Sequence, residues 1–162
     1  MGDRLLKRRL LRVHLFKLIF LYPFNSDGEI ESTIDSYLDS IGDISEDDEY
    51  LTGLKAVSRY NITEEEKNYI KERYFALLDH VEEIDRMLNE TAKGWSTERF
   101  GSADLAILRL ACYEMLFDEA IPEGVAINEA VEIAKIYGGE DSPSFINGIL
   151  GSISAAKKSG KA

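Results

Sequence analysis

Basic residues gather in the first 22 residues of the sequence, where their chemistry suits an anion. This segment holds six lysines and arginines against one aspartate, which leaves a net charge of +5. Because the whole chain has a formal net charge of −11, the rest of the chain carries −16. A basic segment attached to an acidic chain is typical of a local site for a polyanion, rather than of a wholly basic binding protein.

A single helix can bring most of these charges to one face. We predict a helix over residues 4–22, in which Arg4, Arg8 and Arg12 follow one line and Arg9 lies beside them. The apolar side chains expected on the other side are Leu6, Leu10, Val13 and Phe20. Like charges at this spacing repel, and basic residues at a helix N-terminus oppose its dipole, so a bound polyanion would relieve both effects. A basic face exposed to solvent without a partner explains the same residues equally well.

Residue types that carry out catalysis are present, but not in catalytic arrangements. Cys112 falls on the apolar face of a predicted helix, where a cysteine is usually an inert small hydrophobe. His14 and His80 lie in different predicted helices and have no metal-ligand spacing around them. Glu129 and Glu132 lack the Glu-x-x-His partner of a di-iron bundle. With no phosphate-binding glycine loop after a predicted strand, the sequence indicates a protein that is not an enzyme and uses no cofactor or metal.

The spacing of the apolar residues predicts helices along the rest of the chain. They fall at residues 30–41, about 46–59, 64–88, 102–121, 127–137 and 142–156. Thr63 and Glu66 form a capping box that begins the helix at residue 64, and a break near Val81 would divide that helix in two. The last three helices have tight connections and should form a compact bundle.

Capping residues and glycines mark the ends of these last helices. Ser102 and Ser142 are predicted N-caps, with Pro143 at the first helical position. Gly138 is predicted to end the preceding helix in the left-handed conformation. Gly148 lies inside the last helix, where glycine costs about 1 kcal/mol relative to alanine, so we expect another backbone to approach it closely.

The length and composition are those of one soluble domain. The chain has 162 residues, of which 44% are hydrophobic and 30% charged. No apolar run approaches the roughly 20 residues that span a bilayer, so no membrane association is expected. The basic N-terminus lacks the apolar core and cleavage site of a secretory signal. A single cysteine permits no intramolecular disulfide, which fits a cytoplasmic location.

Three segments in the last third of the chain match one family in order and with ungapped spacing. They read D-x-x-I-L-R-L-A-x-Y-E, then I-P-x-x-V-x-I-N-E-A-V-E-I-A-K-x-Y-G, then E-D-S-x-x-F-I-N-G-I-L. Together they resemble the NusB family of bacterial transcription antitermination factors. The resemblance implies an all-α fold of about seven or eight helices in two packed bundles. It also implies a single NusB-like domain over residues 1–162, with helical subdomains at 1–80 and 81–162.

The resemblance implies a non-catalytic, RNA-binding function in transcription regulation. The expected ligand is the single-stranded boxA element of ribosomal RNA leaders, bound together with NusE, a small-subunit ribosomal protein, in the RNA polymerase antitermination complex. The RNA-binding residues that it implies are Arg8, Arg9, Arg12, Lys17, Phe145 and Asn147. An aromatic ring such as Phe145 can stack on an unpaired base, yet Phe145 also continues a core stripe with Ile149 and Ile153.

Other functions remain open at this point. The chain resembles the RNA-binding accessory domain of ribosomal RNA cytosine methyltransferases, although it contains no Rossmann-type segment for a methyl donor. It also fits a helical docking adaptor without RNA binding, and a homodimer through the surface that otherwise meets RNA. Residues 27–49 hold ten acids and no lysine or arginine, which we interpret as a solvated acidic face in preference to a docking surface. The helix at about 46–59 departs from the family pattern.

Overall fold

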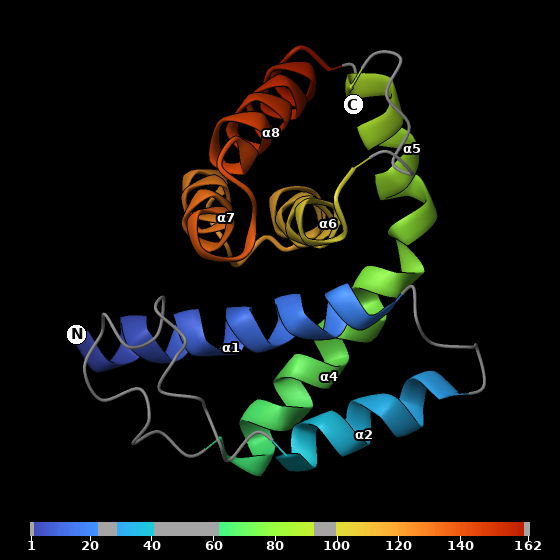
Figure 1. Ribbon diagram of the computed structural model, residues 1–162, viewed down its shortest axis with the longest axis vertical. Coiled ribbons are helices and arrows are strands. Elements are labelled where there is room, and N and C mark those ends of the chain that lie inside the picture. The colour runs from blue at the N-terminus through green and yellow to red at the C-terminus, as the bar shows by residue number, and fades with distance from the viewer. Residues whose placement is uncertain (1, 23–28, 41–61, 93–99, 161–162) are drawn as a thin grey trace. The chain divides into compact units, whose positions relative to one another are not determined.

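The computed structural model of the protein describes residues 2–22, 29–40, 62–92 and 100–160, with side chains from residue 7 onward. These residues form seven helices: α1 (Gly2–Leu21), α2 (Ile30–Ser40), α4 (Glu64–Asp79), α5 (Val81–Thr91), α6 (Ser102–Phe117), α7 (Glu123–Tyr137) and α8 (Ser142–Lys158) (Figure 1). The predicted all-α fold is therefore confirmed. The predicted helix at about 46–59 and the side chains of Arg4 and Leu6 lie outside the described residues. Within those residues, no helix is long and apolar enough to cross a membrane.

The chain divides into two compact units, residues 1–75 and residues 76–162, with the boundary inside α4. In the first unit, polar contacts join α1, α2 and α4. Nδ1 of His14 lies 2.8 Å from the hydroxyl of Tyr37, which connects α1 to α2. The ammonium group of Lys71 donates a hydrogen bond of 2.9 Å to Asp35, which connects α4 to α2. An ion pair at the beginning of α4, described with the site below, connects α1 to α4.

Helix α1 changes character along its length. From Leu10 onward its buried side chains are Leu10, Val13, His14, Leu15, Phe16, Leu18 and Ile19, which at about 100° per residue cover every side of the helix. A helix that is apolar all round is a core helix. The basic face predicted around Arg8, Arg9 and Arg12 belongs to the N-terminal half of the helix, where Arg8 is exposed and Arg9 and Arg12 are half-buried.

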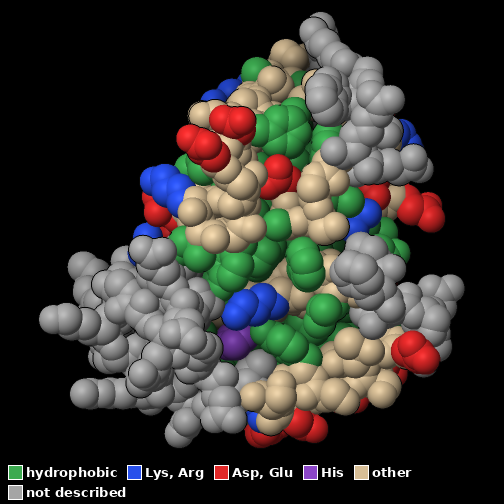
Figure 2. Space-filling view, in the orientation of Figure 1, with side chains coloured by type: hydrophobic (Ala, Val, Ile, Leu, Met, Phe, Trp, Pro, Cys, Tyr) green, Lys and Arg blue, Asp and Glu red, His purple; other side chains and the backbone are tan. Residues whose placement is uncertain are grey.

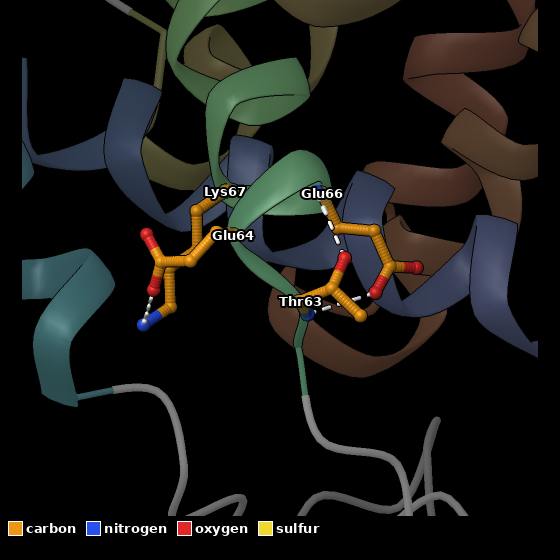
Figure 3. Close-up of polar contacts among 4 residues, drawn as sticks. All are labelled: Thr63, Glu64, Glu66 and Lys67. Carbon is orange, nitrogen blue, oxygen red and sulfur yellow. Dashed lines mark hydrogen bonds and ion pairs between the residues drawn. The ribbon is translucent and has the colours of Figure 1, made fainter.

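The predicted capping box at the beginning of α4 is confirmed (Figure 3). The hydroxyl of Thr63 accepts a hydrogen bond of 3.1 Å from the backbone amide of Glu66. The Oε1 atom of Glu66 accepts one of 2.9 Å from the backbone amide of Thr63. These two bonds satisfy two of the amides that a helix N-terminus leaves without intrahelical partners.

In the second unit, α6, α7 and α8 pack against one another and α5 packs on α6 and α8 (Figure 1). The predicted compact bundle of the last three helices is therefore confirmed. Its core is built from completely buried side chains of all four helices: Ile84, Leu88, Leu108, Cys112, Ala126, Ala134, Ile146 and Leu150.

The break predicted near Val81 is also confirmed, because α4 ends at Asp79 and α5 begins at Val81. His80 occupies the break. Its ring stacks on the ring of Phe117 at the end of α6, with 3.8 Å between centroids and 10° between planes. The stack fixes the beginning of α5 against α6.

Two predicted N-caps are wrong by one residue. Helix α6 begins at Ser102 with Gly101 as its N-cap, and α8 begins at Ser142 with Asp141 as its N-cap. Neither helix has a side-chain capping bond. The buried Ser142 hydroxyl instead accepts a hydrogen bond of 2.8 Å from the amide of Gly139, because it faces back into the turn that precedes the helix.

The reasons predicted for two glycines are wrong as well. Gly138 has φ −94° and ψ −178°, an extended conformation that any residue adopts. A side chain is excluded there by space, since a Cβ atom on Gly138 would lie 2.5 Å from the Cβ of Ser142. Gly148 is exposed, and a Cβ added to it would meet no atom within 4 Å, so no other backbone approaches it in the described structure.

Candidate nucleic-acid interface

The basic end of α1 is the candidate interface. Arg8 is exposed and has no ion-pair partner among the residues that the structure describes, while Arg9 and Arg12 lie half-buried beside it. Arg8 and Arg12 are four residues apart, about one turn, so they project from the same side of the helix. Guanidinium groups offer several N–H donors in a planar fork that fits phosphate oxygens. The chemistry of this surface is therefore that of phosphate binding.

Lys17 does not belong to the same side of α1. It follows Arg8 by nine residues, about two and a half turns, and this places it on the opposite side of the helix. It is half-buried. The structure thus brings Arg8 and Arg12 together and separates Lys17 from them.

The described basic residues of α4 in the first unit are engaged with acids or an aromatic ring. Lys67 pairs with Glu64 at 3.3 Å, and Lys71 pairs with Asp35 at 2.9 Å and with Glu31 at 3.5 Å. The guanidinium of Arg73 lies 4.2 Å from the centre of the exposed Tyr69 ring, a cation–π contact. Bonds to Asp35 and Glu31 raise the pKa of Lys71 above its ordinary value and outweigh its desolvation. These neighbours compete with a phosphate for the three charges of α4, so among the described residues the exposed Arg8 of α1 is the clearest phosphate-binding candidate of the first unit.

Lys7 is the basic residue of α1 that sequence reasoning did not single out. Its ammonium group lies 3.2 Å from Oε1 of Glu66, the same oxygen that accepts the Thr63 amide in the capping box. Partial burial raises the pKa of Glu66, but the hydrogen bonds from Thr63 and the charge of Lys7 outweigh burial, so the pKa lies below the ordinary value. No sequence signal selects this acid as the partner of Lys7, because the first half of the chain contains many other acids.

The other two predicted RNA-binding residues lie on α8, in the second unit. Phe145 is half-buried and meets the ring of Phe100 edge-on, with 5.3 Å between centroids and 79° between planes. Asn147 is exposed. Ile149 and Ile153 are buried, so Phe145 continues their stripe toward the surface while part of its ring remains exposed. The structure describes this pair and the arginines separately, because they belong to different units.

Charges on the second unit are mixed. On the face of this unit drawn in Figure 2, acidic and basic side chains are interspersed, and the described residues form no continuous basic patch there. The Lys135 ammonium, for example, pairs with Glu132 at 3.0 Å on the surface of α7. This face of the second unit therefore gives no electrostatic reason to bind a polyanion, whereas the basic end of α1 does.

The cysteine and the histidines have structural surroundings. Cys112 is completely buried, and burial together with the charge of Asp85 raises the pKa of its thiol to about 12, so it stays protonated at neutral pH. His14 is buried between α1 and α2, and His80 carries the ring stack with Phe117. Among the described residues there is no group of three or more histidines, cysteines and acids that could hold a metal ion.

The described residues thus define an all-helical protein with a basic surface on its first helix, in which the cysteine and the histidines have structural contacts. Comparison with known proteins gives the family. Residues 9–155 match the NusB family. The transcription antitermination protein NusB of Lachnoclostridium phytofermentans is 38% identical over 146 residues, which cover 90% of this chain and 97% of that protein. NusB of Acetivibrio thermocellus is 48% identical over 101 residues, or 62% of this chain and 70% of that protein. The chain belongs to the NusB family, whose named relatives are transcription antitermination proteins and not enzymes.

Solved structures agree with this assignment. NusB of T. maritima superposes with a TM-score of 0.71 at 31% identity, covering 91% of this chain and 90% of that one. A structure of the antitermination factors NusB and NusE in complex with dsRNA superposes with a TM-score of 0.65 at 20% identity, covering 92% and 96% of the two chains, which shows a shared fold. The NusB-like fold predicted from the three sequence segments is confirmed.

Proposed function

We propose that this chain is an RNA-binding transcription antitermination factor that binds single-stranded boxA RNA of ribosomal RNA leaders as a heterodimer with NusE. Membership of the NusB family supports the proposal, and a solved structure of the same fold contains NusB and NusE in complex with dsRNA. The observation that carries it for this chain is the exposed basic end of α1, with Arg8 and Arg12 on one side. The protein acts in the RNA polymerase antitermination complex in the cytoplasm, as one NusB-like domain over residues 1–162.

The mechanism is binding without catalysis. Arg8, Arg9 and Arg12 contact phosphates, which gives affinity and salt dependence but little sequence selection. Base selection needs unpaired bases, which stack on rings and bond to amide groups. Phe145 has a partly exposed ring and Asn147 an exposed amide, and they serve this role together with surface supplied by NusE. Lys17 completes the set of proposed RNA contacts, on the other side of α1.

Charge also suits the proposed protein partner. The chain outside its first 22 residues carries a net charge of −16, which complements a basic ribosomal protein. Complementary potentials speed encounter and exclude partners of like charge. The test of the proposal therefore follows RNA and NusE binding separately.

The experiment is fluorescence anisotropy of a labelled single-stranded boxA RNA across a salt series, with and without NusE. The test variant replaces Arg8, Arg9 and Arg12 with alanine. The matched control replaces Arg86, Lys135 and Lys158, three exposed basic residues of the second unit, and so makes the same change in net charge. A duplex of the same sequence separates recognition of single strands from general attraction to RNA.

We expect wild-type binding to tighten with NusE and to prefer the single strand. The arginine variant should bind far more weakly, and its slope of log K against log salt should fall by about 2, since each lost phosphate contact removes about 0.7. The control should keep the wild-type slope. Equal, weak RNA binding by wild type and the arginine variant, with NusE binding intact, would instead make the chain a docking adaptor without RNA binding.

A further inference from the structure

The pairing of Lys7 with Glu66 has a consequence for RNA binding that rests on the proposed function. Lys7 directly precedes Arg8 on α1, and its charged end lies 3.2 Å from the Glu66 carboxylate at the beginning of α4. The side chains of Lys7 and Glu66 are 24% and 19% exposed. A phosphate bound at the basic end of α1 is therefore near an ammonium group that already has an anionic partner.

Glu66 differs from an ordinary surface acid because its position is fixed. Its Oε1 accepts the Thr63 amide at 2.9 Å, and its own amide donates to the Thr63 hydroxyl at 3.1 Å. A flexible surface pair loses most of its Coulomb attraction to side-chain ordering and is worth little. The capping box has already ordered Glu66, so less of the attraction to Lys7 is lost in this way. Glu64 on the same turn pairs instead with Lys67 of its own helix (Figure 3).

A carboxylate held against a lysine offers the same chemistry as a phosphate oxygen: an anionic acceptor for N–H donors. Phosphate and Glu66 therefore compete for Lys7. We propose that Glu66 is an internal substitute for phosphate that withholds Lys7 from RNA, and so limits the affinity and the salt dependence of the basic end of α1.

The competition can be measured with a double-mutant cycle. Glu66→Gln removes the charge but keeps an oxygen that can accept the Thr63 amide, so α4 retains its beginning. Lys7→Gln removes the other partner, and the double variant carries both changes. Glu65→Gln is the matched control, since Glu65 is exposed on the same turn, loses the same charge and has no ion pair with Lys7 among the described residues. Circular dichroism and thermal unfolding check that each variant folds.

We expect Glu66→Gln to tighten RNA binding roughly threefold to tenfold at low salt, and to steepen the salt slope by about 0.7, the value of one added phosphate contact. Glu65→Gln should change the affinity for RNA and the salt slope far less. Lys7→Gln alone should leave affinity within about twofold of wild type, and in the double variant it should abolish the gain.

Three results would overturn the inference: no gain in Glu66→Gln, an equal gain in Glu65→Gln, or a gain that survives Lys7→Gln. A large loss of affinity in Lys7→Gln alone would overturn it too, because Lys7 would then contact RNA in the wild-type protein. Failure of the proposed function would look different. In that case the wild-type protein would show no salt-dependent RNA binding, or the alanine variant of Arg8, Arg9 and Arg12 would bind RNA as the wild type does.

Discussion

Asp85 of α5 and Arg109 of α6 form a bidentate ion pair. Nε of Arg109 donates to Oδ1 of Asp85 at 2.9 Å, and an Nη atom donates to Oδ2 at 2.8 Å. Arg109 is only 8% exposed, although it lies within the apolar stretch of α6. The pair thus satisfies a nearly buried guanidinium and fixes α5 to the bundle of α6, α7 and α8. It also places a negative charge near the buried thiol of Cys112.

Removing Asp85 should be costly, because it leaves the Arg109 charge buried without this partner. We expect Asp85→Ala to lower the free energy of unfolding by about 3 kcal/mol, the low end for a buried pair, since Asp85 is partly exposed. Urea unfolding followed by circular dichroism measures the change. Glu82→Ala, an exposed acid on the same helix, is the control and should change stability by less than about 0.5 kcal/mol. Adding Arg109→Met to Asp85→Ala should recover part of the loss; further destabilisation by the second change would contradict this account of the pair.

The capping box should make a measurable contribution to α4. Thr63→Ala removes the acceptor for the Glu66 amide and should destabilise the protein by about 1 kcal/mol. Thr63→Ser keeps a hydroxyl in the same place, so the loss of stability should be only a small part of the loss in Thr63→Ala. Thermal and urea unfolding of the three proteins give the comparison, and equal stabilities would show that solvent replaces the cap without cost.

Two glycines should respond to alanine in opposite directions. At Gly138 the new Cβ would lie 2.5 Å from the Ser142 Cβ and 2.9 Å from the Ala134 carbonyl oxygen, so the turn between α7 and α8 must shift. We expect a loss of about 1–3 kcal/mol, the usual range for overpacking. At Gly148 the Cβ meets nothing within 4 Å inside a helix, and alanine should stabilise by up to about 1 kcal/mol. The urea midpoints of the two variants test this, and a shift of both in the same direction would show that the space around these glycines does not decide the result.

Stability should fall in alkali because of Cys112. Its thiol keeps its proton up to a pKa of about 12 in the folded protein, against an ordinary value of 9.0, so unfolding releases a proton between these values. The stability linked to this proton is complete below pH 9 and is lost as the pH rises toward 12, by up to about 1.4 kcal/mol per pH unit. Urea unfolding of wild type and Cys112→Ala at pH 8, 9 and 10 isolates the contribution. Parallel losses in the two proteins would assign the alkaline effect to other groups.

The features that sequence predicted correctly are those that depend on neighbours in the chain. The capping box needs only Thr63, Glu66 and the backbone between them, so its residues reveal it directly. The break at His80 is signalled by acids on both sides that can begin a new helix. The basic end of α1 is visible as a cluster of charge. The family, in turn, follows from three segments whose order and spacing are specific.

The features that sequence missed depend on which distant residues meet. Glycine is required at position 138 because Ser142 approaches it across a turn. The sequence had instead predicted a left-handed backbone conformation there, because glycine commonly ends helices in that conformation. The partner of Lys7 is an acid on another helix, and composition cannot choose it among the many acids of the chain. The burial of α1 on every side from Leu10 onward was not predicted, although residues 10–21 are apolar at every position except Arg12, His14 and Lys17.

The burial of α1 bears on how the chain is synthesised. This helix precedes α2 and α4 in the sequence, and the tyrosine that contacts its buried His14 lies 23 residues further along. A nascent chain that has made only α1 therefore presents an apolar segment with arginines at one end, before its core partners exist. Such segments favour aggregation and attract chaperones while translation continues. The helix proposed to bind RNA is thus also a segment whose exposure during synthesis depends on how fast the following helices emerge.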